Sequence, residues 1–118
     1  MSSEVAKTWL SLQQLLEQLE STSDYKAIDS INQRLLEWIY RQVTEGETLY
    51  VPTIVMKSEV ASPATIHKGL SILEEHGLIS VKVDPSDTRR RIVKTTERTE
   101  RLMKKLSESV MNWAKEVS

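Results

Sequence analysis

Apolar residues near the start of the chain recur at alternating spacings of four and three. The series comprises Val5, Trp9, Leu12, Leu16 and Leu19. This spacing predicts a helix of about four turns with a narrow apolar seam along one side. The polar run from Ser21 to Asp24 interrupts the series, and Ser23 or Asp24 is expected to cap the helix that follows.

Two further segments have the same helical period. The apolar stripe of the first comprises Ile28, Ile31, Leu35, Trp38 or Ile39, and Val43, and Leu36 widens this stripe. Gly46 is expected to end the helix. The last helix opens at Thr96-Glu97 and comprises Leu102 or Met103, Leu106, Val110, Trp113 and Val117. Helices are therefore expected at both ends of the chain.

The middle of the chain predicts two shorter helices. Residues 49–51 are β-prone, and residues 52–57 follow as a short helix with Ile54, Val55 and Met56 partly buried. A second helix starts with Ser62 as its cap and Pro63 in its first position, and Gly77 ends it. Gly69 lies inside this helix at a cost of about 1 kcal/mol relative to Ala, which close packing on a neighbouring helix would explain.

A β-hairpin is expected after these helices. Residues 78–83 alternate weakly between apolar and polar, residues 91–95 return, and Asp84-Pro85-Ser86-Asp87 is typical of a turn. Helix, helix and hairpin in this order predict a winged helix-turn-helix. The fold class is mainly α (α+β), with helical extensions at both ends.

The sequence offers few sites for catalysis or metal binding. It has no Cys, and its two histidines, His67 and His76, lie nine residues apart on one predicted helix, too far apart to share a metal. Neither a glycine-rich phosphate loop nor a nucleophile elbow is present. We therefore expect no enzyme, no cofactor and no metal. No apolar run is long enough to span a bilayer and the N-terminus lacks signal-peptide features, so a cytoplasmic location is expected.

The net charge of −1 hides an uneven distribution along the chain. Residues 1–47 carry four cationic and eight acidic side chains, whereas residues 48–95 carry seven and five. The basic excess therefore lies in the predicted winged segment, where local charge governs contact with DNA.

The helix that starts at Ser62 is the candidate recognition helix. Small residues would let it approach base edges, Thr65 and His67 can hydrogen-bond there, and Lys68 suits a phosphate or a guanine edge. The alternative is an ordinary solvated helix face. The expected DNA contacts on this helix are Ser62, Pro63, Ala64, Thr65, His67 and Lys68.

The hairpin is the candidate wing. Alternation along its second strand sends Arg89 and Arg91 to one face and Arg90 to the other. Arg89, nearest the turn, suits a narrow minor groove, and Asp87 is expected to pair with an arginine and organise the turn. The alternative is a charged hairpin that resists aggregation. The expected DNA contacts of the wing are Asp87, Arg89, Arg90, Arg91 and Lys94.

The apolar seams of the first and last helices need a partner. Pairing across a two-fold axis would bury both seams in a homodimer, whereas packing on each other within one chain is the alternative. Aromatic residues Trp9, Trp38, Tyr40 and Trp113 are candidates to line a small-molecule pocket there, although such spacing is more typical of plain core. The expected dimerisation residues are Val5, Trp9, Leu12, Leu16, Leu106, Val110, Trp113 and Val117.

The segment 48–98 resembles the winged helix-turn-helix of the MarR (multiple antibiotic resistance regulator) family. Two stretches carry the resemblance, one from Ser62 to Ile79 and one from Asp84 to Glu97. The resemblance implies a homodimeric transcriptional regulator, often a repressor, on a pseudo-palindromic operator. It implies one domain, with residues 1–47 and 96–118 for dimerisation and residues 48–95 for DNA binding.

Individual positions also match that family's pattern. The resemblance makes Lys68 a residue near the phosphates, Arg89 the wing-tip arginine and Asp87 the residue that organises the wing. Thr95 and Thr99 depart from the pattern, since the family usually has Leu and Gly there. Two alternative functions stay open: a winged-helix protein-interaction module, and a plasmid or phage replication or partition factor.

Overall fold

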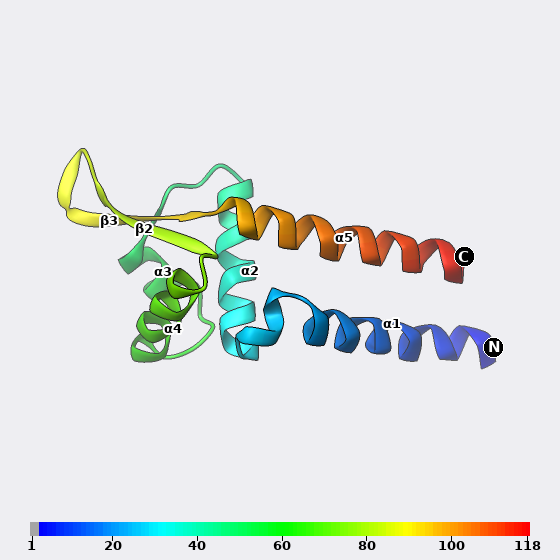
Figure 1. Ribbon diagram of the computed structural model, residues 1–118. Coiled ribbons are helices and arrows are strands. Elements are labelled where there is room, and N and C mark those ends of the chain that lie inside the picture. Colours follow the sequence, from blue (N-terminus) through cyan, green and yellow to red (C-terminus); the bar gives the residue numbers. More distant parts are fainter. Residues whose placement is uncertain (1–2) are drawn as a thin grey trace. The chain divides into compact units, whose positions relative to one another are not determined.

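The computed structural model describes residues 3–118, with side chains from Val5 onward, and confirms a mainly α winged helix-turn-helix (Figure 1). The elements are α1 (Ser3–Thr22), the 3-10 helix η1 (Asp24–Ala27), α2 (Ser30–Thr44), β1 (Leu49–Tyr50), α3 (Val51–Lys57), α4 (Pro63–Glu75), β2 (Ile79–Asp84), β3 (Asp87–Thr95) and α5 (Glu97–Val117).

The described chain forms two compact units. The winged unit comprises residues 28–100, and the terminal helical unit comprises the described residues up to 27 together with residues 101–118. Helix α2 packs against α4 and β3 and so belongs to the winged unit. From the sequence, α2 was grouped with the N-terminal helix, because periodicity shows that a helix has an apolar face but not what covers that face.

The start of α2 differs from the expectation. Its N-cap is Asp29, whose side chain accepts a hydrogen bond from the Asn32 backbone N–H. Ser23 and Asp24 do not cap this helix, because the short helix η1 intervenes, and the Ser23 hydroxyl accepts from the Tyr25 backbone N–H instead. The end of α2 agrees with the expectation, since Gly46 follows it with a positive φ of 88°.

The short helix α3 buries one side only. Val51 and Ile54, three residues apart, are buried in the winged unit. The expectation that Met56 is partly buried is wrong, since it is 78% exposed. With about 3.6 residues per turn, Met56 lies on the face opposite Ile54.

Gly69 allows α4 to approach α2 closely. A Cβ atom added at Gly69 would overlap the Asn32 Oδ1 atom and lie 3.0 Å from Leu35 Cδ2. Asn32 and Leu35 are both buried on α2. The close helix packing inferred from the sequence is therefore confirmed, and it explains why a helix-weakening residue stands at this position.

Helices α2, α3 and α4 surround a core that extends to one face of a small antiparallel sheet. The strand order is β1-β3-β2, with Leu49 and Val81 both opposite Val93, and Val83 opposite Arg91. The other face carries Tyr50 and Lys82, both opposite Ile92. We call the first the inner face and the second the outer face. The fully buried side chains of the winged unit are Leu35, Leu36, Ile39, Ile54, Ile66, Leu73, Leu78, Val93 and Thr99.

Two threonines join the start of α5 to the end of α4. The Thr96 hydroxyl accepts from the Thr99 N–H and donates to the Gly77 carbonyl, and the buried Thr99 hydroxyl donates to the Leu78 carbonyl. Thr99, which departs from the family pattern, thus makes a buried hydrogen bond here that Gly lacks the side chain to make. These bonds join the start of α5 to the segment between α4 and β2, at the base of the hairpin.

Candidate nucleic-acid interface

The first turns of α4 present small and polar side chains to solvent. Ser62 caps the helix, accepting from the Thr65 N–H at 3.3 Å and donating to the Thr65 hydroxyl at 2.9 Å. Ile66 and Leu70 point into the core, which turns His67 and Lys68 outward. All six residues expected on this helix are exposed: Ser62, Pro63, Ala64, Thr65, His67 and Lys68.

The turn of the wing is organised by two aspartates. Asp84, only 4% exposed, accepts from the Ser86 N–H at 2.8 Å. Strand β3 already begins at Asp87, opposite Asp84, so it is longer than the sequence analysis expected. The register shifts between Val83 and Asp84, where a bulge increases the local twist.

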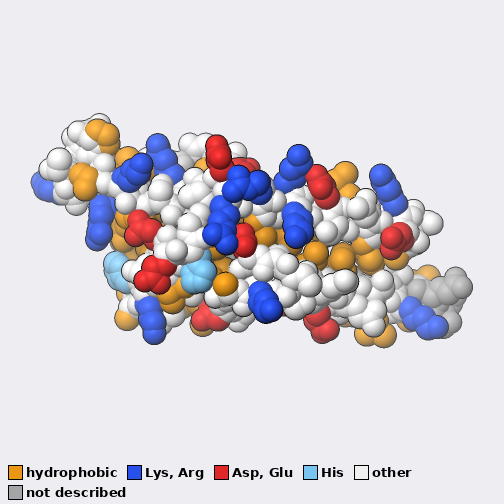
Figure 2. Space-filling view, viewed as in Figure 1, with side chains coloured by type: hydrophobic (Ala, Val, Ile, Leu, Met, Phe, Trp, Pro, Cys, Tyr) orange, Lys and Arg blue, Asp and Glu red, His pale blue; other side chains and the backbone are white. Residues whose placement is uncertain are grey.

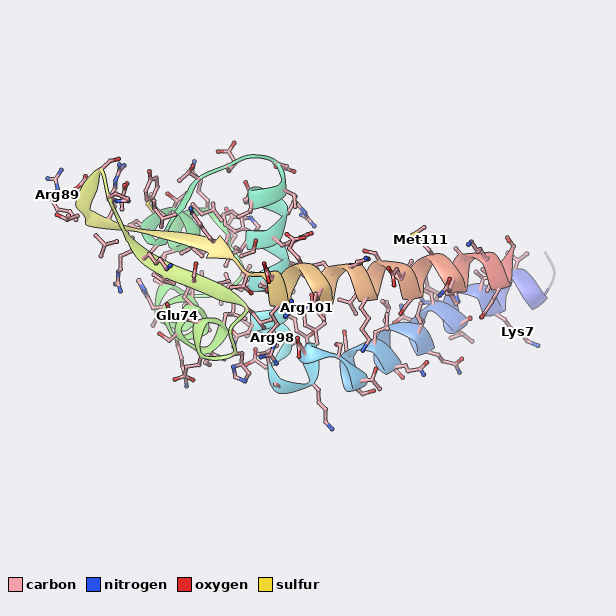
Figure 3. All side chains as sticks on the ribbon, turned by 45° about the horizontal axis from the view of Figure 1, so that its top comes forward. Lys7, Glu74, Arg89, Arg98, Arg101 and Met111 are labelled. Carbon is pink, nitrogen blue, oxygen red and sulfur yellow. The ribbon has the colours of Figure 1, made fainter. Side chains whose placement is uncertain are left out.

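Arg89 forms a two-pronged ion pair with Asp87. Its Nε lies 3.0 Å from Oδ1 and its Nη2 lies 3.2 Å from Oδ2, and its backbone N–H also donates to Oδ1. The Arg89 hydrogen bonds hold the pKa of the Asp87 carboxyl below its usual value. The Arg89 side chain is nevertheless 88% exposed and projects from the tip of the hairpin (Figure 3). The pairing of Asp87 with an arginine is thus confirmed.

Arg90 is held by intramolecular contacts. Its guanidinium lies 3.2 Å from Asp84 Oδ2 and 3.5 Å from Asp87 Oδ2, and 4.3 Å above the Tyr50 ring. A cation stacked on an aromatic face and paired with a buried carboxylate contributes to the shape of the wing. These contacts give Arg90 a role within the hairpin, and its expected contact with DNA stays a prediction.

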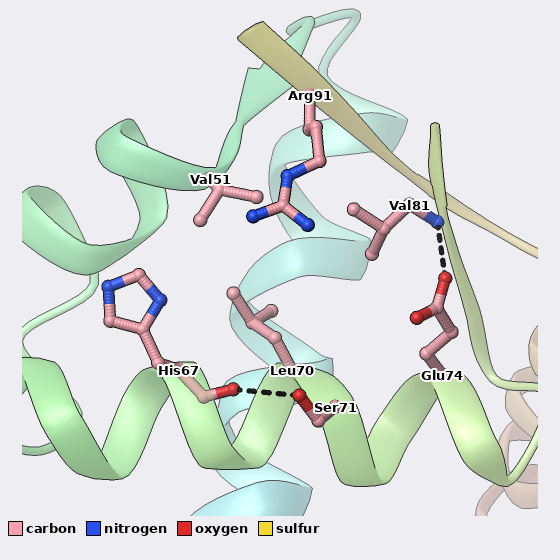
Figure 4. Close-up of a pocket in the computed structure, with 7 residues that line it drawn as sticks. All are labelled: Val51, His67, Leu70, Ser71, Glu74, Val81 and Arg91. Carbon is pink, nitrogen blue, oxygen red and sulfur yellow. Dashed lines mark hydrogen bonds between the residues drawn. The ribbon is translucent and has the colours of Figure 1, made fainter. Parts of the chain in front are cut away.

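Arg91 extends from the inner face of the sheet toward α4. It lines a pocket of about 80 Å³ together with Val51, Leu70, Val81, His67, Ser71 and Glu74 (Figure 4). Arg91 and His67 were expected as separate contacts, one on the wing and one on the helix, and the fold brings them to one place. Ser71 and Glu74 were not predicted from the sequence, although the spacing 67, 71, 74 places them on one helix face with His67.

Lys94 lies on the other side of the wing. It stands opposite Ser80 and is exposed, and it lines a groove with Lys82 and Ile92. This is the outer face, so the structure does not bring Lys94 together with Arg91 and α4.

Nothing in the part of the chain that the structure describes forms a metal site. No group of three or more His, Cys, Asp or Glu side chains is close enough there to hold an ion. His76 lies at the end of α4 with its Nδ1 2.8 Å from the Ile72 carbonyl oxygen. None of the described helices has the length and apolar character to cross a membrane.

Comparison with solved structures identifies the architecture. A point mutant of MepR from S. aureus, bound to an oligodeoxyribonucleotide, superposes with a TM-score of 0.74 and 18% identity, covering 99% of this chain and 83% of that one. PcaV from Streptomyces coelicolor in complex with its natural ligand superposes with a TM-score of 0.57 and 24% identity, covering 87% of this chain and 70% of that one. MarR superposes with a TM-score of 0.60 and 20% identity, covering 87% of this chain and 74% of that one.

The chain has the winged-helix fold of the MarR-type regulators. Comparison of the sequence with protein-family models and with curated proteins gave no match. Within this fold, α4 is the second helix of the helix-turn-helix and the β2–β3 hairpin is the wing.

The terminal helical unit corresponds to the extensions that the MarR resemblance assigns to dimerisation. Within this unit the Trp113 Nε1–H donates to the Ser11 hydroxyl at 2.8 Å, so α1 and α5 meet within one chain. Trp9 is 64% exposed. Figure 2 shows hydrophobic side chains on the surface of this unit. The expected dimerisation residues divide into the exposed Val5, Trp9, Leu16, Val110 and Val117 and the partly covered Leu12, Leu106 and Trp113.

Two exposed apolar residues of this unit escaped the sequence analysis. Leu10 is 62% exposed and Met111 is 60% exposed, and Met111 points away from α1 (Figure 3). Each directly follows a residue of a predicted apolar seam. An apolar residue next to the seam was the sequence signal that could have identified them.

Proposed function

We propose that this chain is a sequence-specific DNA-binding transcriptional regulator of the MarR type, a repressor that acts as a homodimer on a pseudo-palindromic operator. Two copies of α4 enter successive major grooves about one helical turn apart, roughly 34–36 Å, and the wings reach the flanking minor grooves. The protein has no catalytic role in this proposal.

One observation carries the proposal. The capped start of α4 exposes Thr65, His67 and Lys68, and a hairpin with an exposed arginine at its tip stands beside the same helix. A helix with small and polar residues suits base edges, and an exposed arginine suits phosphates or a narrow minor groove. The DNA-bound MepR structure, which shares this fold, supports the same use of the two elements.

Selection of bound sequences from random duplex DNA tests the proposal. We expect an enriched motif made of two inverted half-sites centred about 10 base pairs apart. The Thr65→Ala variant should relax the base preference at one position of each half-site, with non-specific binding little changed. A wild-type protein that shifts no duplex at low salt would contradict DNA binding and favour the protein-interaction alternative.

Repression needs a separate measurement. A reporter gene under a promoter that contains the selected motif should be silenced when this protein is present, and should recover with a variant that has lost DNA binding. Activation of the reporter would overturn the repressor role and leave the DNA-binding role intact.

A small-molecule effector is a further part of the proposal, motivated by the ligand-bound PcaV structure. The expected result is that a ligand that raises the melting temperature of the protein also releases it from the selected duplex. A ligand that binds without any effect on DNA affinity would contradict an effector role.

A further inference from the structure

The pocket between α4 and the wing joins two donor side chains from different elements. His67 comes from the exposed side of α4, and Arg91 comes from the inner face of β3 (Figure 4). Both side chains are exposed, so the pocket is open to a large ligand. Arg always carries its charge, and the His67 ring offers an N–H donor in either tautomer.

Arg91 is the member of the arginine triplet without an intramolecular ion pair. Arg89 is paired with Asp87, and Arg90 is paired with Asp84 and Asp87. Among the residues that the structure describes, Arg91 forms no ion pair and no hydrogen bond through its side chain. Its guanidinium can therefore bind an external anion without giving up an internal partner, which the other two would have to do.

The position of the pocket indicates which anion this is. If α4 enters a major groove and the wing tip reaches the neighbouring minor groove, the sugar-phosphate backbone between the two grooves must pass between helix and wing. The pocket lies between those two elements. Its volume of about 80 Å³ accommodates a phosphate group.

We propose that His67 and Arg91 together bind one backbone phosphate, the phosphate that separates the major groove read by α4 from the minor groove reached by the wing. This inference rests on the proposed function and assigns a positioning role within it. Because one phosphate contacts both elements, it sets how α4 and the wing are aligned along the DNA.

The remaining polar residues of the pocket are consistent with a single anion. Glu74 lies at the far end, where its carboxylate accepts from the Val81 backbone N–H at 3.1 Å. The Ser71 hydroxyl donates to the His67 carbonyl of its own helix at 3.4 Å. The Glu74 charge opposes a second phosphate in the pocket and limits the depth to which the first one enters.

A methylphosphonate scan tests the assignment. The selected duplex is synthesised with a neutral methylphosphonate at one phosphate at a time, and its affinity is measured for the wild type, Arg91→Ala and His67→Ala. We expect one position per half-site where the wild type loses about tenfold or more in affinity and where each variant loses clearly less than the wild type. The plot of log binding constant against log salt concentration should be less steep for Arg91→Ala than for the wild type, by about one unit of slope per half-site.

A double variant and a matched control complete the test. The losses of Arg91→Ala and His67→Ala should combine to less than their sum, because both side chains bind the same phosphate. Lys82→Ala, a change on the outer face of the same hairpin, should keep the wild-type sensitivity at that phosphate. Circular dichroism should show that each variant keeps its fold, since Arg91 and His67 are exposed.

The two proposals fail in different ways. If the wild type binds duplex DNA but the two losses are additive, or the two variants respond at different phosphates, the shared phosphate is wrong and the DNA-binding function stands. If the wild type binds no duplex at all, both proposals are wrong.

Discussion

Three adjacent arginines in the wing occupy three different environments. Arg89 pairs with Asp87 at the tip, Arg90 stacks on Tyr50, and Arg91 turns toward α4. Side-chain alternation along a strand separates Arg90 from its two neighbours. The turn geometry then separates Arg89 from Arg91, because Arg89 pairs with Asp87 and Arg91 does not.

The Asp87 carboxyl should report on the Arg89 pair. Its pKa is lowered by the Arg89 hydrogen bonds, so the pair favours the folded hairpin above the ordinary aspartate pKa and is lost as the pH falls through the lowered value. We expect Arg89→Ala to raise the pKa of Asp87, measured by NMR titration of the side-chain carboxyl. Arg91→Ala is the control and should leave it unchanged. An Asp87 titration that is identical in Arg89→Ala and the wild type would contradict the pairing in solution.

Glu59 has a left-handed backbone conformation in the turn between α3 and α4. Its φ is 54°, in a region that costs residues other than glycine about 1 kcal/mol. We expect Glu59→Gly to raise the free energy of unfolding by about 0.5 kcal/mol. This is less than the backbone strain that is removed, because glycine gains entropy in the unfolded chain. Urea denaturation measures the change. Glu47→Gly, at an exposed position without a positive φ, should bring no stabilisation.

At the scale of elements, the pair α2–α4 depends on the absence of a side chain at Gly69. We expect Gly69→Ala to destabilise the protein by about 1–3 kcal/mol despite its gain of about 1 kcal/mol in helix propensity, because the new methyl group overlaps Asn32. Chemical denaturation measures the change, and the double variant Gly69→Ala/Asn32→Ala should recover part of the loss. Lys68→Ala, on the exposed face of α4, should be nearly neutral. A stabilised Gly69→Ala protein would show that the helices are not in close contact.

The junction of α2 with the first turn of α5 should be sensitive to alkaline pH. The Tyr40 hydroxyl donates to Glu100 Oε2 at 3.0 Å, and burial, helped by that bond and by the Glu100 charge, raises the pKa of Tyr40. The protonated phenol is thus favoured in the folded state. Its contribution to folding stability is fully present below the ordinary tyrosine pKa of about 10 and is lost as the pH rises through the raised pKa.

Denaturation across that alkaline range tests this junction. The wild type should lose stability as the pH rises above about 10, and Tyr40→Phe should lack that part of the decline. Glu100→Gln removes the charge but not the burial, so its decline should be smaller than in the wild type and should end at a lower pH. An identical alkaline decline in Tyr40→Phe and the wild type would assign the effect to other groups.

At the scale of the whole molecule, the terminal helical unit leaves apolar surface without a partner in one chain. Val5, Trp9, Leu10 and Met111 are each about 60% exposed. Exposed apolar side chains gathered on one pair of helices are typical of a protein interface, and a second copy is the partner in the proposed homodimer.

Sedimentation equilibrium at micromolar concentration tests the homodimer. The expected mass is twice the chain mass of 13.5 kDa. Leu10→Glu should weaken the dimer by about tenfold or more, because it places a charge in the interface, whereas Lys104→Ala on an exposed polar position should leave it intact. A monomer mass for the wild type would contradict the dimer.

Much of the fold could be predicted because its signals are local. The Ser62 cap, Pro63 and the Gly77 stop define α4 within a few neighbouring residues, and the turn residues from Asp84 to Asp87 define the hairpin. The same logic misplaced the start of α2, because Ser23, Asp24 and Asp29 are all suitable caps and only the packing of η1 selects among them.

The candidate site was predictable in its residues but not in its connections. Local sequence patterns were enough to predict that α4 exposes His67 and Lys68, that a basic hairpin follows, and that the terminal helices carry apolar seams, because helical and strand periodicities depend on neighbouring positions. The stacking of Arg90 on Tyr50 and the pocket that Arg91 shares with His67 depend instead on the folded chain. Those partners are 24 to 40 residues apart in the chain, and strand register and helix packing determine which of them meet.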